Sequence, residues 1–215
     1  IFKDIGRSLD DLTAQLLLCH PLEVMKNAEK LSNRINRMEK VSLPEVKPFY
    51  LLLDTVKDEY TSRALADPLN NVAAALRIQY NLIRWYAEKG LLMQAITLAR
   101  EWVVSVVGWK MKKTFVLQLD QRKELERGLT GLARLLRQES DTTVDNLSES
   151  GKFLYRSYGQ PVELARAYDM LIKLRNDVNH AGMSPDSQAA QKITQKFKEE
   201  ILPALEDLRQ WSETE

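Results

Sequence analysis

The chain has 215 residues, of which 44% are hydrophobic and 28% are charged, so it can bury a core under a soluble surface. Basic and acidic residues nearly cancel, 31 against 30, so net charge gives no argument for a nucleic-acid partner and any such binding must be local. Only 8 glycines and 7 prolines argue against an all-β fold, which needs many turns.

The single cysteine, Cys19, cannot form an intramolecular disulfide, which fits a reducing cytoplasm. Cysteine is among the most buried residue types, so we expect Cys19 to be a small core residue. No apolar run approaches the ~18 residues of a membrane span, and we expect no membrane partner. Charge follows Ile1 at once, unlike a signal peptide, and there is no initiator methionine. We therefore expect the C-terminal part of a longer protein, or a trimmed one.

Apolar residues recur at spacings of three and four in the first third of the chain, which predicts helices over 1–16, 24–38 and 49–60. Two prolines within 42–48 predict a linker there. We interpret residues 1–66 as an N-terminal helical appendage or connector.

The helical pattern strengthens further along. A stripe over 69–87 ends at Gly90, a suitable C-cap, and the most apolar helix runs over 92–106 and ends at Gly108. Another helix is predicted over 115–136.

Two glycines, Gly128 and Gly131, weaken the predicted helix over 115–136 by about a kcal/mol each. Residues 138–151, rich in Ser, Asp, Thr and Glu, predict an exposed, mobile loop.

The last predicted helices cover 161–178, with Pro161 in the first turn, and 185–208, which Pro203 should kink or split. No segment shows convincing strand alternation. We therefore predict an all-α fold: a helical bundle over 67–215, joined to the helical appendage.

The segment Arg175-Asn176-Asp177-Val178-Asn179-His180 carries the most chemical information. Arginine supplies a permanent cation whose planar donors fit a phosphate, and histidine exchanges protons near neutral pH. On an ideal helix, side chains five positions apart lie roughly 140° and ~7.5 Å apart. Arg175 and His180 can therefore share a cleft only if the helix loosens, which Ala181-Gly182 permits. The alternative is a surface arginine beside a histidine that favours the helix dipole.

The stretch from Leu174 to Gly182 resembles the signature of HEPN ribonucleases: an arginine, a polar residue next to it (here Asn176), and a histidine after four to six positions. The residues from Tyr80 to Val107, with Tyr86-Ala87-Glu88-Lys89-Gly90 and Gln94-Ala95-Ile96-Thr97-Leu98-Ala99-Arg100-Glu101, resemble the helical hairpin of CRISPR-associated members. The resemblance covers residues 68–215.

The resemblance implies a HEPN-like bundle that cuts single-stranded RNA as a C2 homodimer with a composite active site. In CRISPR-associated members, a CARF domain senses cyclic oligoadenylate and the HEPN domain cuts RNA. No CARF domain is visible in this sequence, so such an activator would act through a domain outside it.

For the reaction itself, we expect the RNA 2′-OH to attack the adjacent phosphorus, which gives 2′,3′-cyclic phosphate and 5′-OH ends. His180 would transfer protons or position the 2′-OH, Arg175 would hold the non-bridging oxygens, and Asn176 would orient either. No histidine or cysteine lies at ligand spacing around His180, so we expect no metal and no cofactor.

Several alternatives stay open. The chain could be a HEPN toxin of a toxin–antitoxin pair, or a catalytically silent helical domain that binds RNA or dimerises. The hairpin partly imitates a tetratricopeptide repeat, but no second copy follows at a fixed period. Glu101 is either a solvated flank, which we favour slightly, or a buried carboxylate that pairs with an arginine.

Overall fold

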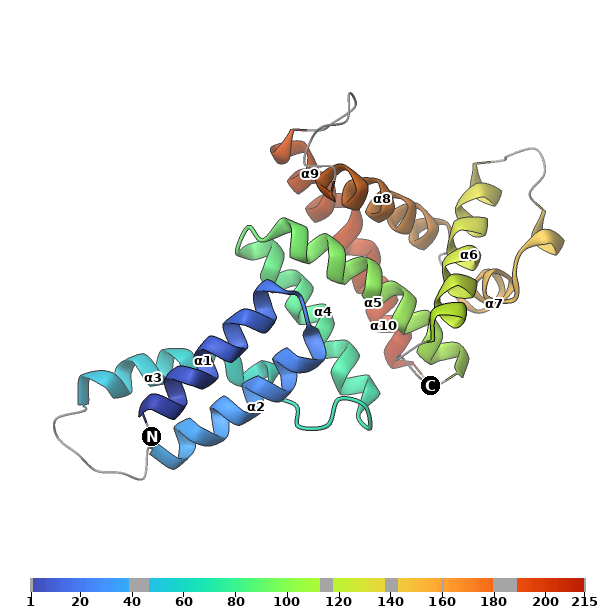
Figure 1. Cartoon of the computed structure of the whole chain (residues 1–215). Helices are drawn as coiled ribbons and strands as arrows, with labels where there is room; N and C mark the ends of the chain where they lie inside the picture. The colour runs from blue at the N-terminus through green and yellow to red at the C-terminus, as the bar shows by residue number, and fades with distance from the viewer. Residues whose placement is uncertain are drawn as a thin grey trace. The chain divides into compact units, whose positions relative to one another are not determined.

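The computed structural model describes residues 2–38, 47–112, 118–137, 143–159, 161–179 and 189–214 (Figure 1). Within these ranges the chain forms helices and no strand, which confirms the predicted all-α fold. The α-helices are α1 (Phe2–Leu17), α2 (Pro21–Met38), α3 (Lys47–Tyr60), α4 (Val72–Glu88), α5 (Leu92–Lys112), α6 (Leu119–Leu136), α7 (Glu149–Ser157), α8 (Pro161–Asn179), α9 (Ala190–Lys196) and α10 (Leu202–Glu213). None of these described helices is long and apolar enough to cross a membrane.

Two compact units divide the chain, Ile1–Leu82 and Ile83–Glu215, and they meet inside α4. We call them unit 1 and unit 2. Because one continuous helix contributes to both, this division does not test the domain boundary expected at residue 66, which stays a prediction.

Unit 1 is built on a hairpin of α1 and α2. Their buried residues recur at helical spacing and face each other across the hairpin: Ile5, Leu12 and Leu16 on α1, and Val24, Ala28, Leu31 and Ile35 on α2. Cys19 lies in the turn between the helices, half-buried, with a φ of 58°. The expectation of a core cysteine is therefore wrong, because the hairpin places this residue in a left-handed turn.

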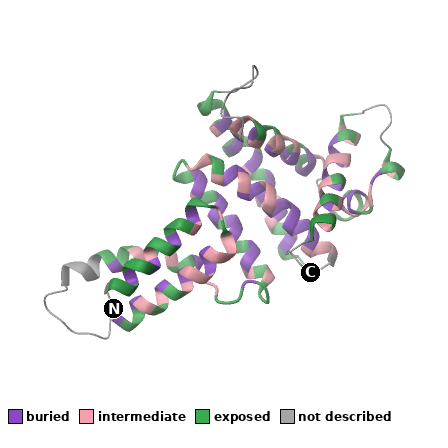
Figure 2. Cartoon of the chain, in the orientation of Figure 1, coloured by how far each residue is buried: buried purple, intermediate pink, exposed green. Residues whose placement is uncertain are grey.

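The central helix of unit 2 is α5, which contacts α6, α7, α8 and α10. Every residue from Trp102 to Val107 is buried, so this part of the helix is buried on all sides. Figure 2 shows buried residues in purple along the helix, and the apolar ones are Ala95, Ile96, Leu98, Ala99, Trp102, Val103, Val104, Val106 and Val107. A helix that is apolar all round must be enclosed by others, and this explains why the sequence shows its most apolar stretch here.

Two glycines were predicted to end helices, Gly90 after α4 and Gly108 in α5, and they behave differently. Gly90 adopts a φ of 75°, and the Leu91 N–H donates to the Tyr86 carbonyl at 2.8 Å, which confirms the predicted C-cap. Gly108, in contrast, does not end α5, which continues to Lys112. Burial of the helix on all sides overrides the low helix propensity of one glycine.

Helices α6 and α7 approach each other through small residues. A Cβ atom on Gly128 of α6 would lie 2.2 Å from the Ser150 hydroxyl and 2.6 Å from the Gly151 nitrogen of α7. Gly128 therefore permits a close helix contact, although it lowers helix propensity.

The same contact corrects the loop prediction for 138–151. Residues 138–142 lie outside the described part, but Val144–Asn146 forms a 3₁₀ turn and α7 begins at Glu149. Ser150 and Gly151 are buried, so residues that are typical of an exposed loop here form a helix interface.

Pro203 interrupts the last helix, as predicted. A π-helical turn, Phe197–Ile201, separates α9 from α10, and Pro203 is the second residue of α10. Proline donates no N–H and its ring clashes with the carbonyl four residues earlier, so the chain widens locally.

Candidate active site

Helix α8 carries the arginine of the predicted site. The helix begins at Pro161, whose fixed φ suits a first turn. The negative charge of Glu163 is attracted to the positive end of the helix dipole. Its buried face consists of Leu164, Ala165, Ala167, Tyr168, Leu171 and Leu174. This face holds α8 against α5 and α6, and so fixes the positions of the residues that follow Leu174.

Arg175 is half-buried and Asn176 is exposed in the last two turns of α8. No hydrogen bond or ion pair joins Arg175 to another residue in the described ranges. Its neighbour Asn176 lies about 100° further around the helix and points to a different side. His180 follows Asn179, the last described residue of α8, and so lies outside the described residues.

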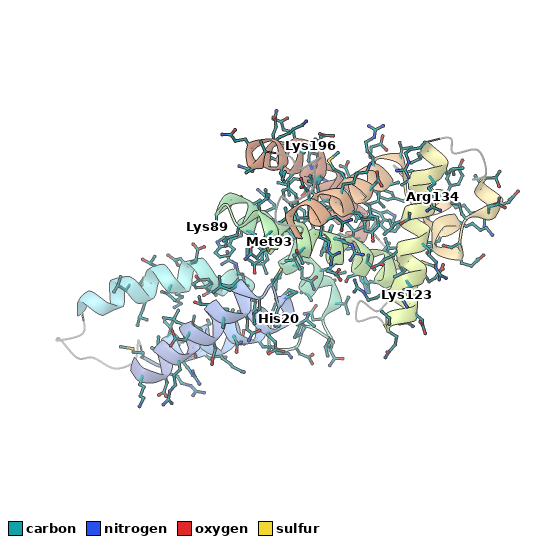
Figure 3. The ribbon with its side chains drawn as sticks, turned by 45° about the horizontal axis from the view of Figure 1, so that its top comes forward. His20, Lys89, Met93, Lys123, Arg134 and Lys196 are labelled. Atoms are coloured by element: carbon teal, nitrogen blue, oxygen red, sulfur yellow. The ribbon has the colours of Figure 1, made fainter. Side chains whose placement is uncertain are left out.

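Two segments distant in sequence lie at the same end of unit 2 as Arg175. Helix α5 runs antiparallel to α8, so its first turn, with Met93, lies near the C-terminal end of α8 (Figures 1 and 3). Met93 is 52% exposed, and α9 places Lys196 on this side as well (Figure 3). This end of the unit thus carries the exposed side chain of Met93 and the cation of Lys196.

A polar cluster lies nearer the N-terminus of α8, where this helix packs on α5 and α6. It consists of Arg100 and Glu101 on α5, Arg122 and Glu126 on α6, and Tyr168 on α8. The Arg100 guanidinium binds Glu101 at 2.8 Å and Glu126 at 3.0 Å, and Arg122 also pairs with Glu101. Of the two alternatives for Glu101, neither holds in full: its carboxylate pairs with two arginines, but 40% of the side chain is exposed.

Burial and charge act together on the titration of this cluster. Burial opposes the charge of Arg100, but Tyr168, Glu126 and Glu101 outweigh it and raise the pKa of Arg100. Burial raises the pKa of the Tyr168 phenol to about 12, so its hydroxyl stays protonated at neutral pH. The Tyr168 hydroxyl has no hydrogen-bond partner among the described residues.

Most of this cluster and a line of cations on α6 were not predicted from the sequence, because the apolar periodicity of α6 indicates only its buried face. Lys123, Arg127 and Arg134 fall at spacings of four and seven, which is a helical stripe visible in the sequence alone. In the part of the chain that the structure describes, no three His, Cys, Asp or Glu residues gather where a metal ion could bind.

A scan against protein-family models and searches of curated proteins and of solved structures found no match to this chain.

Proposed function

We propose that the chain is a metal-independent endoribonuclease in which Arg175, Asn176 and His180 form half of a dimeric active site. The observation that carries this proposal is the state of Arg175: it lies on a helix, half-buried, without a carboxylate partner among the described residues. An arginine in that state is available to bind a phosphate with two parallel hydrogen bonds.

The chemistry follows from the residue types. Arg175 holds the non-bridging oxygens and stabilises the charge of the phosphorane, and Asn176 orients the arginine or the phosphate. His180 removes the 2′-OH proton, donates a proton to the leaving 5′-oxygen, or positions the 2′-OH. Each chain supplies one motif histidine, so a C2 dimer would bring the second one that concerted acid–base catalysis needs.

The wider setting of the proposal comes from the HEPN resemblance. We propose that the chain is the effector part of a CRISPR-associated antiviral protein, with cyclic oligoadenylate acting through a sensor domain outside this sequence. Such a ligand would act by binding one arrangement of the dimer cleft more tightly than another. A gene that continues some ~150 residues upstream would favour this setting over a toxin–antitoxin pair.

Incubation of the purified chain with end-labelled single-stranded RNA in EDTA tests the activity. We expect 2′,3′-cyclic phosphate and 5′-OH products, and a loss of about 10²- to 10⁴-fold for His180→Ala. His20→Ala is the matched control, because it removes the other histidine of the chain, in the α1–α2 turn of unit 1.

An RNA whose scissile nucleotide carries 2′-deoxyribose should stay intact. Cleavage of that RNA, cleavage that requires a divalent metal, or full activity of His180→Ala would contradict the mechanism. A strictly monomeric but active chain would contradict the composite site.

A further inference from the structure

A cleft of about 630 Å³ lies between α6 and the segment that leads into α7. The α6 wall is a single helical stripe of Lys123, Arg127, Thr130 and Arg134, and Asn146 and Ser148 face it from the other wall. Figure 3 shows Lys123 and Arg134 towards opposite ends of α6. The stripe of cations missed in the sequence therefore lines one concave surface, which we call the α6 cleft.

The charges of the α6 cleft are predominantly positive. The described residues of its lining include three cations and one carboxylate, Glu126, and that carboxylate already binds Arg100 at 3.0 Å. Lys123 and Arg127 form no ion pair with any residue of the described ranges. Positive charge on a concave surface attracts anions more strongly than the same charge on a flat one.

The cations, rather than a helix terminus, make this an anion site. At the N-terminus of α7, the Gly151 N–H donates to Ser148, and the Ser150 N–H donates to the Glu124 carboxylate at 3.1 Å. These backbone donors are occupied within the protein, so the side-chain cations, Lys123 and Arg127 above all, have to carry the binding.

The length of the stripe indicates an extended anion. Lys123 and Arg134 are eleven positions apart, which corresponds to about 16 Å along a helix. A single phosphate contacts only one part of such a stripe, whereas the backbone of a nucleic-acid strand presents a phosphate at each nucleotide. Among the described residues that line the cleft there is no aromatic side chain on which a base could stack.

We propose that the α6 cleft binds the phosphodiester backbone of single-stranded nucleic acid. Binding through phosphates alone is independent of base sequence and does not distinguish RNA from DNA. The cleft contains no residue of α8, so this binding goes beyond the proposed cleavage at Arg175 and does not depend on it.

Fluorescence anisotropy with a labelled DNA strand of about 12 nucleotides tests the proposal. DNA lacks the 2′-OH nucleophile, so the measurement is not affected by cleavage. We expect Lys123→Gln combined with Arg127→Gln to weaken binding by more than about tenfold near 0.1 M salt, and to reduce the slope of log K against log salt by about 1.4.

The matched control removes the same charges from an exposed face of α2, as Lys30→Gln combined with Arg37→Gln, and should leave binding unchanged. Lys123→Arg combined with Arg127→Lys keeps both charges and should retain binding. Far-UV circular dichroism confirms that each variant is folded.

Three outcomes would overturn the proposal: no binding by the wild-type chain, equal losses in the cleft and α2 variants, or an unchanged salt slope. Cleft-dependent DNA binding together with full RNA cleavage by His180→Ala would overturn the proposed function but leave the α6 cleft proposal intact. Cleavage without cleft-dependent binding would do the reverse.

Discussion

The arginines of the polar cluster and the arginine at the end of α8 show how the same side chain can serve two purposes within one unit. Arg100 and Arg122 are held between helices by Glu101 and Glu126. Arg175 lies on α8, the helix that also carries Tyr168 of the cluster, but it has no acidic partner among the described residues. Paired guanidinium groups stabilise helix packing, whereas an unpaired one keeps its donors available for a ligand.

Removal of the Arg175 charge should give the largest effect, and it should appear in activity. We expect Arg175→Gln to lower kcat by about 10²- to 10³-fold, because it removes a charged donor from the phosphorane. The free energy of unfolding should change by less than about 0.5 kcal/mol, since no described residue loses a partner. Arg175→Lys should recover only part of the activity, because an ammonium cannot bind a phosphate in bidentate geometry. Equal activity of Arg175→Gln and wild type would remove the contrast with the cluster.

Removal of the Arg100 charge should show the opposite pattern. We expect Arg100→Met to lower the free energy of unfolding by about 2–3 kcal/mol in urea denaturation, because Glu126 loses its partner. This lies below the range for fully buried pairs, since both carboxylates are partly exposed.

The control for Arg100 is the double variant Arg100→Met with Glu126→Met. Replacement of both charges by apolar groups should recover most of the stability, because no unpaired buried charge remains. A double variant as unstable as Arg100→Met would show that packing of the arginine stem, and not the ion pair, holds α5 to α6.

The apolar pattern of the sequence predicted the helices that carry the site. The buried stripe of α8, the enclosed α5 and the Gly90 cap all follow from spacing and residue type. The pattern failed where burial does not depend on apolar side chains. Ser150 and Gly151 are buried because they fit against Gly128, and a sequence shows such a fit only when the partner helix is known.

The candidate site, like the fold, was predictable only where a local pattern in the sequence indicates it. Arg175 and Asn176 were recognised by their spacing from His180, and that interpretation stays a prediction. The pairing of Glu101 with Arg122 and the cations of the α6 cleft depend on how α5, α6 and α7 come together. Residues 21 positions apart give no local signal of such a contact.

The Gly128 contact gives the next largest effect on stability. We expect Gly128→Ala to lower the free energy of unfolding by about 1–2 kcal/mol, because the added Cβ would overlap the backbone of α7. Gly6→Ala in α1 is the control: a Cβ there meets nothing within 4 Å, so better helix propensity should stabilise the chain by about 0.5–1 kcal/mol. A stabilised Gly128→Ala variant would show that α6 and α7 separate readily.

The phenol of Tyr168 gives the smallest effect and is visible only at alkaline pH. Burial raises its pKa to about 12, from about 10 in the unfolded chain. A raised pKa means that the folded state favours the protonated phenol, so its contribution to stability is complete below pH 10 and is lost as pH rises through 12. Stability should therefore fall between these two pH values in wild type, and also through Tyr158, whose pKa burial likewise raises to about 12.

We expect Tyr168→Phe to be within about 0.5 kcal/mol of wild type at pH 8, since the Tyr168 hydroxyl has no hydrogen-bond partner among the described residues. At pH 11 the variant should be the more stable by about 1.4 kcal/mol, as measured by urea denaturation at both pH values. A parallel decline of the two proteins would mean that the phenol ionises without disturbing the polar cluster.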